Sequence, residues 1–276
     1  MFRAVVTDLD GTLLNQHHRV SEYTLETISL LMKKGIPVIV ATGRPHPDVL
    51  HTLKSCGLQG MYVITSNGAR IIDPQLNPIA SLDLSTELVS DLIQLKYSTD
   101  NPVDCAGSDF SVNLYRHDEW VTDVGKEVLL DMFASSGFRY KVVDNLPAYP
   151  KDGVHELFYM ADSSTLLKLE NAVKTRFAGK VECMMSTPLT LDVVHADANK
   201  AKAMMTVAKL LNIELKNIVA FGDGMNDVKM LASAGRGYVM GNAQQRLKEA
   251  LPDLEVIGSN AEDGVAKKLR ELFGLQ

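Results

Sequence analysis

Short apolar runs alternate with amphipathic stretches in the first part of the chain. The runs are rich in β-branched residues and too short for buried helices, which is typical of buried strands; they cover residues 3–7, 36–41 and 61–65. The first stretch between them carries Leu25, Ile28 and Leu31 at helical spacing and ends at a glycine. Residues 69–82 follow an Asn-Gly turn signal and indicate a hairpin. This alternation predicts a parallel sheet with right-handed crossovers.

The same alternation returns towards the C-terminus. Apolar runs indicate further strands of that sheet at residues 191–195, 217–222, 237–240 and 255–257, with helices between them. Residues 84–189 mix strands and helices in a different order, with helical stretches near 85–97, 123–134 and 163–177. We therefore expect an α/β protein with two domains. Residues 1–83 and 190–276 are predicted to form a discontinuous, Rossmann-like doubly wound domain, and residues 84–189 an inserted α+β domain.

The composition of the chain excludes some kinds of partner and favours one cellular compartment. The 276 residues include 34 acidic and 28 basic ones, so neither nucleic acid nor an anionic membrane is an expected partner. A strand begins near residue 2 and no apolar run is long enough to cross a bilayer, so we expect neither a signal peptide nor a membrane span. Cys56, Cys105 and Cys183 are isolated, which favours free thiols in a reducing compartment. We expect a cytoplasmic monomer or weak homo-oligomer.

Polar side chains gather directly after three of the predicted strands. The clusters are Asp8 with Asp10, Thr42 with Gly43 and Arg44, and Asp223 with Asn226 and Asp227. Ligands of open parallel sheets bind outside the carboxyl ends of the strands, so these distant stretches are expected to share one crevice.

Neighbouring carboxylates repel each other, which indicates a cation between them. Asp8, Asp10 and Asp223 supply oxygen ligands of the kind that Mg²⁺ prefers. We therefore predict a magnesium site formed by these three acids.

The remaining polar groups suit a phosphate. The Thr42 hydroxyl and the Gly43 amide can bind phosphate oxygens, and Lys200 can neutralise their charge. Asp8 as a nucleophile must approach an anion, and two unit charges about 4 Å apart repel by roughly 4 kcal/mol at an effective dielectric constant of about 20. A cation and a lysine would offset that repulsion. Asp10 could then protonate the leaving group and later activate water.

These residues resemble the motifs of the haloacid-dehalogenase-type phosphatases. Residues 8–12 (DLDGT) match the first motif, 41–44 (ATGR) the second, Lys200 the third and 222–227 (GDGMND) the fourth. The large insertion between the second and third motifs resembles the C2-type cap of the Cof-like branch. Four further segments are similar to bacterial sugar-phosphate and pyridoxal-phosphate phosphatases: residues 64–70, 118–120, 219–227 and 245–248.

The resemblance implies a Mg²⁺-dependent phosphatase that forms an aspartyl-phosphate. It implies Asp8 as nucleophile and metal ligand, Asp10 as acid/base and carbonyl ligand, and Asp223 as metal ligand. The implied phosphate ligands are Leu9 through its amide, Thr42, Gly43, Lys200 and Asn226. Supporting roles fall to Arg44 and Asp227. Small phosphorylated metabolites, led by sugar phosphates and pyridoxal phosphate, are the expected substrates.

One departure concerns the third motif, where Lys200 is followed by Ala201 instead of the usual glycine and Lys202 lies nearby. Side chains two positions apart on a helix point to nearly opposite sides, so only one lysine can face the site. We assign Lys200 by its place in the motif, with Lys202 as the alternative.

Other interpretations of the same residues are weaker. A calcium loop fails because its glycine comes too early, and a dinucleotide fingerprint fails because its third glycine is absent. A dehalogenase would have no use for Asp10. A phosphomutase and an inactive phosphometabolite-binding regulator remain as alternatives. Five residues could contact a leaving group but are more readily explained structurally: His46, Asn113, Arg116, Trp120 and His155.

Overall fold

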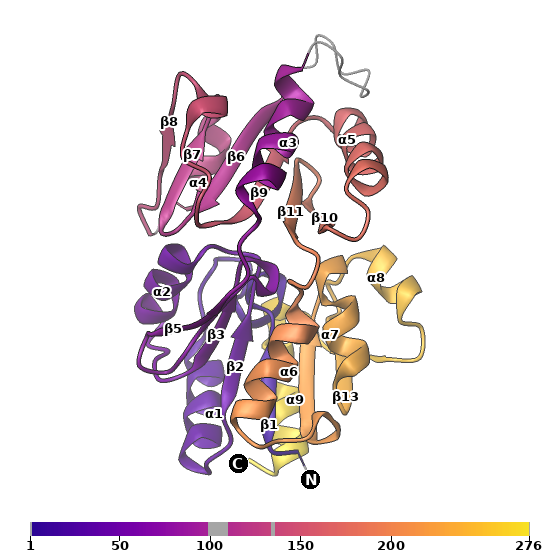
Figure 1. Cartoon of the computed structure of the whole chain (residues 1–276). Helices are drawn as coiled ribbons and strands as arrows, with labels where there is room; N and C mark the ends of the chain where they lie inside the picture. The colour runs from indigo at the N-terminus through magenta and orange to yellow at the C-terminus, as the bar shows by residue number, and fades with distance from the viewer. Residues whose placement is uncertain (1, 99–109, 134–135, 276) are drawn as a thin grey trace. The chain divides into compact units, whose positions relative to one another are not determined.

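The computed structural model describes residues 2–98, 110–133 and 136–275, and the chain divides into two compact units (Figure 1). The first unit comprises Met1–Gly43, Leu53–Ala80 and Asn199–Gln276, and the second comprises Arg44–Thr52 and Ser81–Ala198. Cys105 lies outside the described residues. Among the residues described, no helix has both the length and the apolar character needed to cross a bilayer.

The first unit contains an eight-stranded sheet in the order β14-β13-β12-β1-β2-β3-β4-β5. The six strands from β14 to β3 run parallel, and β4 pairs antiparallel with β3. The bounds are β1 (Ala4–Thr7), β2 (Val38–Ala41), β3 (Tyr62–Thr65), β4 (Arg70–Ile72), β5 (Pro78–Ser81), β12 (Ile218–Gly222), β13 (Arg236–Val239) and β14 (Glu255–Val256). The predicted parallel sheet is thus confirmed.

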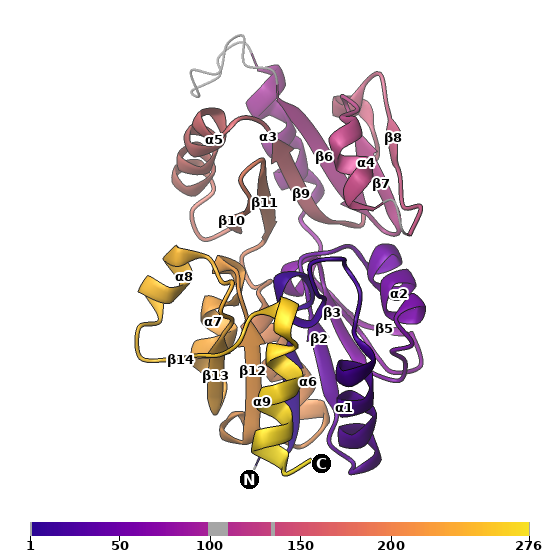
Figure 2. The same cartoon turned by 180° about the vertical axis from the view of Figure 1, so that it is seen from behind.

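Helices cover both faces of this sheet. Figure 2 shows α1 and α9 on one face, and Figure 1 shows α6 and α7 on the other. The helices of this unit are α1 (Glu22–Lys33), α6 (Lys200–Leu210), α7 (Val228–Ser233), α8 (Gln245–Ala250) and α9 (Gly264–Phe273). The boundary divides α2 (His46–Ser55), whose residues up to Thr52 belong to the second unit. Because β1 is buried between the two layers, all four of its residues are inaccessible to solvent. This explains why the central strands have continuous apolar runs instead of alternating ones.

The second unit contains a six-stranded sheet in the order β10-β11-β9-β6-β7-β8, together with α3, α4, α5 and most of α2. Its strands pair antiparallel except for β7 and β8, which are parallel. The bounds are α3 (Thr86–Tyr97), β6 (Ser111–Arg116), β7 (Glu119–Thr122), α4 (Glu127–Met132), β8 (Tyr140–Val142), β9 (Val154–Met160), α5 (Ser163–Arg176), β10 (Val181–Thr187) and β11 (Thr190–His195).

The alternation of side chains along β9 divides the core of the second unit. Leu157 and Tyr159 belong to the larger apolar cluster, which α3 and α5 share. Phe158 and Met160 belong to a smaller aromatic cluster around Trp120. Successive strand residues point to opposite faces, so both faces of this strand are buried and carry apolar residues.

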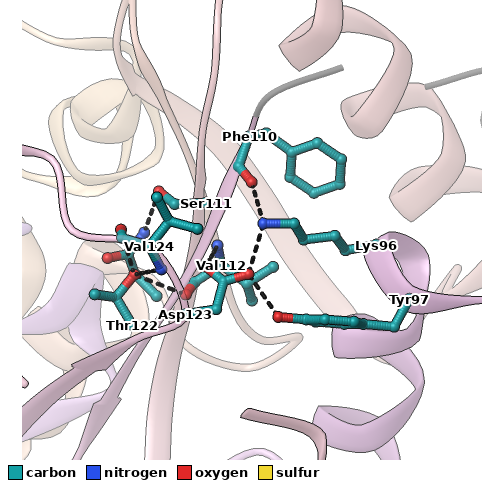
Figure 3. Close-up of polar contacts among 9 residues, drawn as sticks. Lys96, Tyr97, Phe110, Ser111, Val112, Thr122, Asp123 and Val124 are labelled. Atoms are coloured by element: carbon teal, nitrogen blue, oxygen red, sulfur yellow. Dashed lines mark hydrogen bonds and ion pairs between the residues drawn. The ribbon is translucent and has the colours of Figure 1, made fainter. Parts of the chain in front are cut away.

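A polar network joins α3 to the strands β6 and β7 (Figure 3). Lys96 Nζ donates to Asp123 Oδ2 at 2.6 Å and to the Phe110 carbonyl oxygen at 2.5 Å. Tyr97 Oη donates to the same carboxylate oxygen at 2.8 Å, and the Val112 amide donates to Asp123 Oδ1 at 2.9 Å. Burial and the Asp123 carboxylate raise the pKa of Tyr97. Asp123 therefore ties together groups from separate elements.

Two elements differ from the sequence-based expectations. The run at 191–195 was expected in the parallel sheet, and this is wrong: it lies in β11, which pairs antiparallel with β9 and β10. Apolar runs buried on both faces occur in central strands of either kind of sheet, so the run alone does not specify its sheet. The helix expected at 123–134 begins only at Glu127, because Asp123 takes part in the network with Lys96.

Candidate active site

The end of β1 places Asp8 beside the end of β12. Thr7 is paired with Phe221 in the parallel ladder, and the Asp8 amide donates to the Phe221 carbonyl at 3.0 Å. The chains that continue from these two strands therefore emerge together, bringing Asp8 close to Asp223. This is the convergence that the positions of the motifs predicted.

The loop after Asp8 is shaped by contact with Asp223. Gly11 has φ +70°, and a Cβ at this position would lie 2.3 Å from Asp223 Oδ2. Thr12 Oγ1 donates to Asp223 Oδ1 at 2.9 Å. The amide of Leu14 donates to the Leu9 carbonyl at 2.8 Å and closes the turn. Glycine at position 11 thus meets two requirements at once, left-handed backbone and close approach to a carboxylate.

Three carboxylates form a compact cluster. Oxygens of Asp8, Asp223 and Asp227 all lie within 4.8 Å of one another. Asp10 is not part of this side-chain group: its carboxylate is 39% exposed and lies 3.6 Å from His18 Nδ1. Of the three acids predicted to form a magnesium site, the structure brings Asp8 and Asp223 together, with Asp227 as the third member of the cluster. The Asp10 carboxylate lies apart, and the family resemblance implies that Asp10 would bind a metal through its carbonyl.

Lys200 lies inside the cluster. Its side chain is fully buried, and Nζ donates to Asp8 Oδ1 at 2.6 Å and to Asp227 Oδ1 at 2.7 Å. Lys202 is exposed, and its amide is bound by the Asn199 side chain that caps α6. Of these two lysines, Lys200 is therefore the one that contacts Asp8.

The cluster holds three acids and one lysine, and burial and the repulsion between the acids raise the pKa values of Asp8 and Asp223. Burial raises the pKa of Asp8 well above its usual range despite the charge of Lys200. Burial, and then the Asp227 charge, raise the pKa of Asp223 to about 6. Burial lowers the pKa of Lys200, but the charges of Asp227 and Asp8 raise it by more, so the net pKa is raised and the lysine is a cation. A bound cation would offset the repulsion among the three carboxylates, which one lysine does not balance. Carboxylate oxygens are hard ligands that suit Mg²⁺.

Asp227 has less freedom than the other two acids. Its Oδ1 accepts from Lys200, and its Oδ2 accepts from the amides of Asp223 and Gly224, both at 3.0 Å. A Cβ on Gly222 would lie 2.6 Å from this carboxyl group. Asp227 therefore holds the loop that carries Asp223, while Asp8 and Asp223 are the better placed of the three to hold a metal.

The predicted phosphate ligands Thr42 and Asn226 are connected by a residue that the sequence did not single out. Asn67 is 1% exposed, and its amide donates to the Thr42 carbonyl at 3.1 Å. Its side-chain Oδ1 accepts from Asn226 Nδ2 at 3.0 Å. The signals in the sequence were the Asn-Gly pair, which indicated a turn, and the similarity of residues 64–70 to other phosphatases, which gave Asn67 no role.

Two more asparagines that were missed hold the loop after Asp8. Asn242 Nδ2 donates to the Gly11 carbonyl at 2.7 Å, and Asn242 Oδ1 accepts from the amide of Asn260 at 2.9 Å. Asn260 Nδ2 in turn donates to the Leu14 carbonyl at 2.8 Å. Both ends of the loop are thereby tied to one pair of side chains. No local sequence pattern could have indicated contacts between residues so far apart.

The other predicted residues have structural contacts within the second unit. Arg44 donates to Asp48 at 2.7 Å and to Thr52 at 3.3 Å. The five residues considered for the leaving group are bound as follows: His46 lies 3.2 Å from Asp118, Trp120 donates to Asn113 at 3.0 Å, Arg116 binds Glu119 and Asp152, and His155 stacks on Tyr115.

Comparison with known proteins identifies the family. A model of the haloacid dehalogenase-like hydrolases matches residues 5–269. A Haemophilus influenzae protein provisionally named a phosphatase is 38% identical over 275 residues, covering 99% of this chain and 98% of its own length. A Yersinia pestis HMP-PP phosphatase is 34% identical over 269 residues, covering 98% and 94%. The chain belongs to the haloacid dehalogenase-like hydrolases, and the predicted enzyme class, a phosphatase, is confirmed.

Solved structures share the fold. A haloacid dehalogenase-like hydrolase from Bacteroides thetaiotaomicron superposes with a TM-score of 0.83 at 25% identity, covering 99% of this chain and all of that one. A Bacillus subtilis hydrolase of the same kind gives 0.84 at 26%, covering 98% and 100%. A sugar phosphatase of subclass IIB gives 0.80 at 22%. The predicted α/β fold class is confirmed.

Proposed function

We propose that this chain is a Mg²⁺-dependent phosphatase that hydrolyses small phosphorylated metabolites through an aspartyl-phosphate intermediate. The observation that carries the proposal is the buried Lys200, whose Nζ lies 2.6 Å from Asp8 and 2.7 Å from Asp227 beside a third acid. A buried carboxylate held by a lysine is suited to attack an anionic group, because the lysine offsets the repulsion.

The first chemical step forms a bond between an Asp8 carboxylate oxygen and phosphorus, and breaks the bond from phosphorus to the leaving oxygen. Lys200 fixes the orientation of the Asp8 carboxylate through its 2.6 Å contact. Asp10 has a more exposed carboxylate and gives its proton to the leaving alkoxide. Splitting hydrolysis into two displacements lowers the barrier of each.

In the second step, water attacks the phosphorus of the aspartyl-phosphate. Asp10, now ionised, takes a proton from the water, and the bond between phosphorus and the Asp8 oxygen breaks. Inorganic phosphate leaves, the Asp8 carboxylate is restored, and Asp10 is again protonated. One carboxylate cannot be nucleophile and acid at once, so this scheme needs both.

The donor set fits a divalent cation. Asp8 and Asp223, with the Asp10 carbonyl, would hold Mg²⁺, which would neutralise the phosphate oxygens. The proposed phosphate ligands are the Leu9 amide, the Thr42 hydroxyl, the Gly43 amide, Lys200 and Asn226. Arg44 and Asp227 are assigned supporting roles, consistent with their contacts to Asp48 and to the Asp223 and Gly224 amides.

The proposal also covers the substrate class, the role of the inserted domain, the cellular location and the oligomeric state. One relative's name specifies HMP-PP, and the sequence resemblance adds sugar phosphates and pyridoxal phosphate as candidate substrates. We assign selection of the leaving group to the inserted domain, residues 84–189. The net charge of −6 supports an enzyme that binds neither nucleic acid nor membranes. Free thiols at Cys56 and Cys183 support a cytoplasmic location, and a monomer or weak homo-oligomer is proposed.

Phosphate release from p-nitrophenyl phosphate, with and without Mg²⁺, tests the proposal. We expect turnover that depends on Mg²⁺ and is abolished by EDTA. Lack of turnover with this substrate and with a panel of phosphorylated metabolites would favour the inactive binding regulator. Transfer of phosphate to a sugar instead of to water would favour the phosphomutase.

A further inference from the structure

We propose that Asn67 is a positioning residue of the phosphate site: its side chain holds the Asn226 amide, and its backbone holds the Thr42–Gly43 segment. The inference depends on the proposed function, since Thr42, Gly43 and Asn226 are phosphate ligands only there. Asn67 does not itself bind substrate in this account. It acts through groups that do.

The contact between Asn67 and Asn226 joins segments 159 residues apart. Asn226 Nδ2 donates to Asn67 Oδ1 at 3.0 Å, and Asn67 is 1% exposed. This hydrogen bond is partly buried, and it restricts the rotation of the half-buried Asn226 side chain. The direction in which Asn226 presents its amide therefore depends on Asn67.

Asn67 also packs directly on Gly43. A Cβ on Gly43 would lie 3.1 Å from Asn67 Oδ1 and 3.3 Å from Asn67 Nδ2, which is tighter than ordinary contact. The Asn67 amide donates to the carbonyl of the preceding Thr42 at 3.1 Å. Asn67 thus meets the backbone of the second motif through its amide and through its side chain.

The same turn touches the start of the helix that carries Lys200. The turn η2 comprises Ser66–Gly68, and a Cβ on Gly68 would lie 2.5 Å from the carbonyl of Asn199. Asn199 is the N-cap residue of α6, directly before Lys200. One short turn therefore meets the segments that carry four of the five proposed phosphate ligands: Thr42, Gly43, Lys200 and Asn226.

The backbone of this turn is in a conformation that side chains disfavour. Ser66 has φ +47°, Asn67 has φ +53° and Gly68 has φ +102°. Asparagine tolerates the left-handed region better than most residues, but glycine adopts it at lower cost. Glycine at position 67 would suit the backbone, so the group that only asparagine provides is the side-chain amide that binds Asn226.

This difference defines the test variant. Asn67→Gly keeps the backbone conformation and removes the amide. Asn212 is the matched control, because it also has φ +53° but is exposed after the end of α6, away from the site. With p-nitrophenyl phosphate and Mg²⁺, we expect Asn67→Gly to lower kcat/KM by about 10- to 100-fold, because small misplacements of binding groups have effects of this size. We expect Asn212→Gly to match wild type.

Melting temperatures establish that the variants are folded. The loss of one partly buried hydrogen bond should lower the melting temperature of Asn67→Gly by no more than about 4 °C. Full activity of this variant would overturn the proposal. Equal loss in Asn212→Gly would also overturn it, because the effect would then belong to left-handed asparagines in general.

A double-mutant cycle distinguishes positioning from a general structural role. If Asn67 acts through Asn226, Asn67→Gly should change kcat/KM of the Asn226→Ala variant by less than about threefold. The same loss in both backgrounds would contradict the proposal, since Asn67 would then act independently of Asn226.

Binding of inorganic phosphate in the presence of Mg²⁺, measured by calorimetry, separates this inference from the proposed function. We expect Asn67→Gly to weaken phosphate binding about tenfold. If wild type binds phosphate without hydrolysing esters, the phosphatase proposal fails, and the phosphate affinities still decide the role of Asn67. If wild type hydrolyses esters and Asn67→Gly does so equally well, only the positioning role fails. If wild type neither binds nor hydrolyses, both fail.

Discussion

Lys200 Nζ lies 2.6 Å from Asp8 Oδ1, although 192 residues separate the two along the chain. The contact is formed because the N-terminus of α6 lies near the carboxyl end of β1, a central strand of the parallel sheet. The lysine also binds Asp227 at 2.7 Å, so a single cation bridges two acids in a buried site.

Substituting the two lysines tests which one serves the site. Lys200→Ala leaves Asp8 and Asp227 buried without their cation, and breaking a buried ion pair costs about 3–5 kcal/mol. We expect kcat/KM to fall by about 100-fold or more and the melting temperature to fall. Lys202→Ala is the control and should change stability by less than about 0.5 kcal/mol, because its side chain is exposed. A larger loss of activity in Lys202→Ala would reverse the assignment.

The pKa of Asp223 predicts how Mg²⁺ stabilises the protein at different pH values. Burial raises this pKa from 3.8 to about 6, so without a cation the ionised form is disfavoured in the folded state. The neutral Asp223 carboxyl therefore stabilises the folded state at low pH. This contribution to the free energy of unfolding disappears as the pH rises from about 4 to about 6. Mg²⁺ binds the ionised form and competes with the proton.

Thermal denaturation with and without Mg²⁺, at two pH values, tests this competition. The rise in melting temperature caused by Mg²⁺ should be larger at about pH 7.5 than at about pH 5, and Asp223→Asn should reduce it at both. An equal or larger rise at the lower pH would contradict a metal site at Asp223.

The asparagine pair that ties down the loop after Asp8 predicts an effect on catalysis. Asn242→Asp keeps the size of the side chain and its acceptor for the Asn260 amide, but it cannot donate to the Gly11 carbonyl. We expect kcat to fall about tenfold, because Asp10 precedes Gly11 and would lose its fixed position. Steady-state kinetics measures this. Wild-type kcat in Asn242→Asp would show that the Gly11 contact does not position the loop.

The Asp123 network predicts a stability effect in the second unit. Asp123→Asn removes the charge that holds Lys96 and should lower the free energy of unfolding by about 2–3 kcal/mol. Tyr97→Phe removes only one hydrogen bond to this carboxylate and should cost about 1 kcal/mol. Denaturant unfolding compares the two. Equal small losses would mean that the ion pair with Lys96 contributes little.

The sequence predicted those parts of the site that depend on local pattern. Asp8, Asp223 and Lys200 each follow or begin an element with a clear periodicity, and the parallel sheet then brings them together. The contacts of Asn67 and Asn242 were not predictable, because each depends on a partner from a distant segment that only the folded chain places there. Asp227 was expected in a supporting role, but the contacts through which it would act, with Lys200 and two backbone amides, were not predictable.

The misplaced strand has a related cause. The run at 191–195 is as apolar as the strands of the first sheet, but it pairs with β9 and β10 in the second. The apolar composition of this run indicates that it is buried, but buried strands occur in both sheets. Pairing is decided by the neighbouring strands, and one sequence does not reveal these.

The initial rate of phosphate release by Asp8→Asn, with saturating Mg²⁺, is the most direct test of the account. Asparagine has nearly the same size as aspartate but cannot form the phosphorylated intermediate, so we predict a loss of roughly 10⁴-fold or more in kcat with the fold intact. Hydrolysis at a rate close to wild type would show that Asp8 is not the nucleophile and would contradict the mechanism.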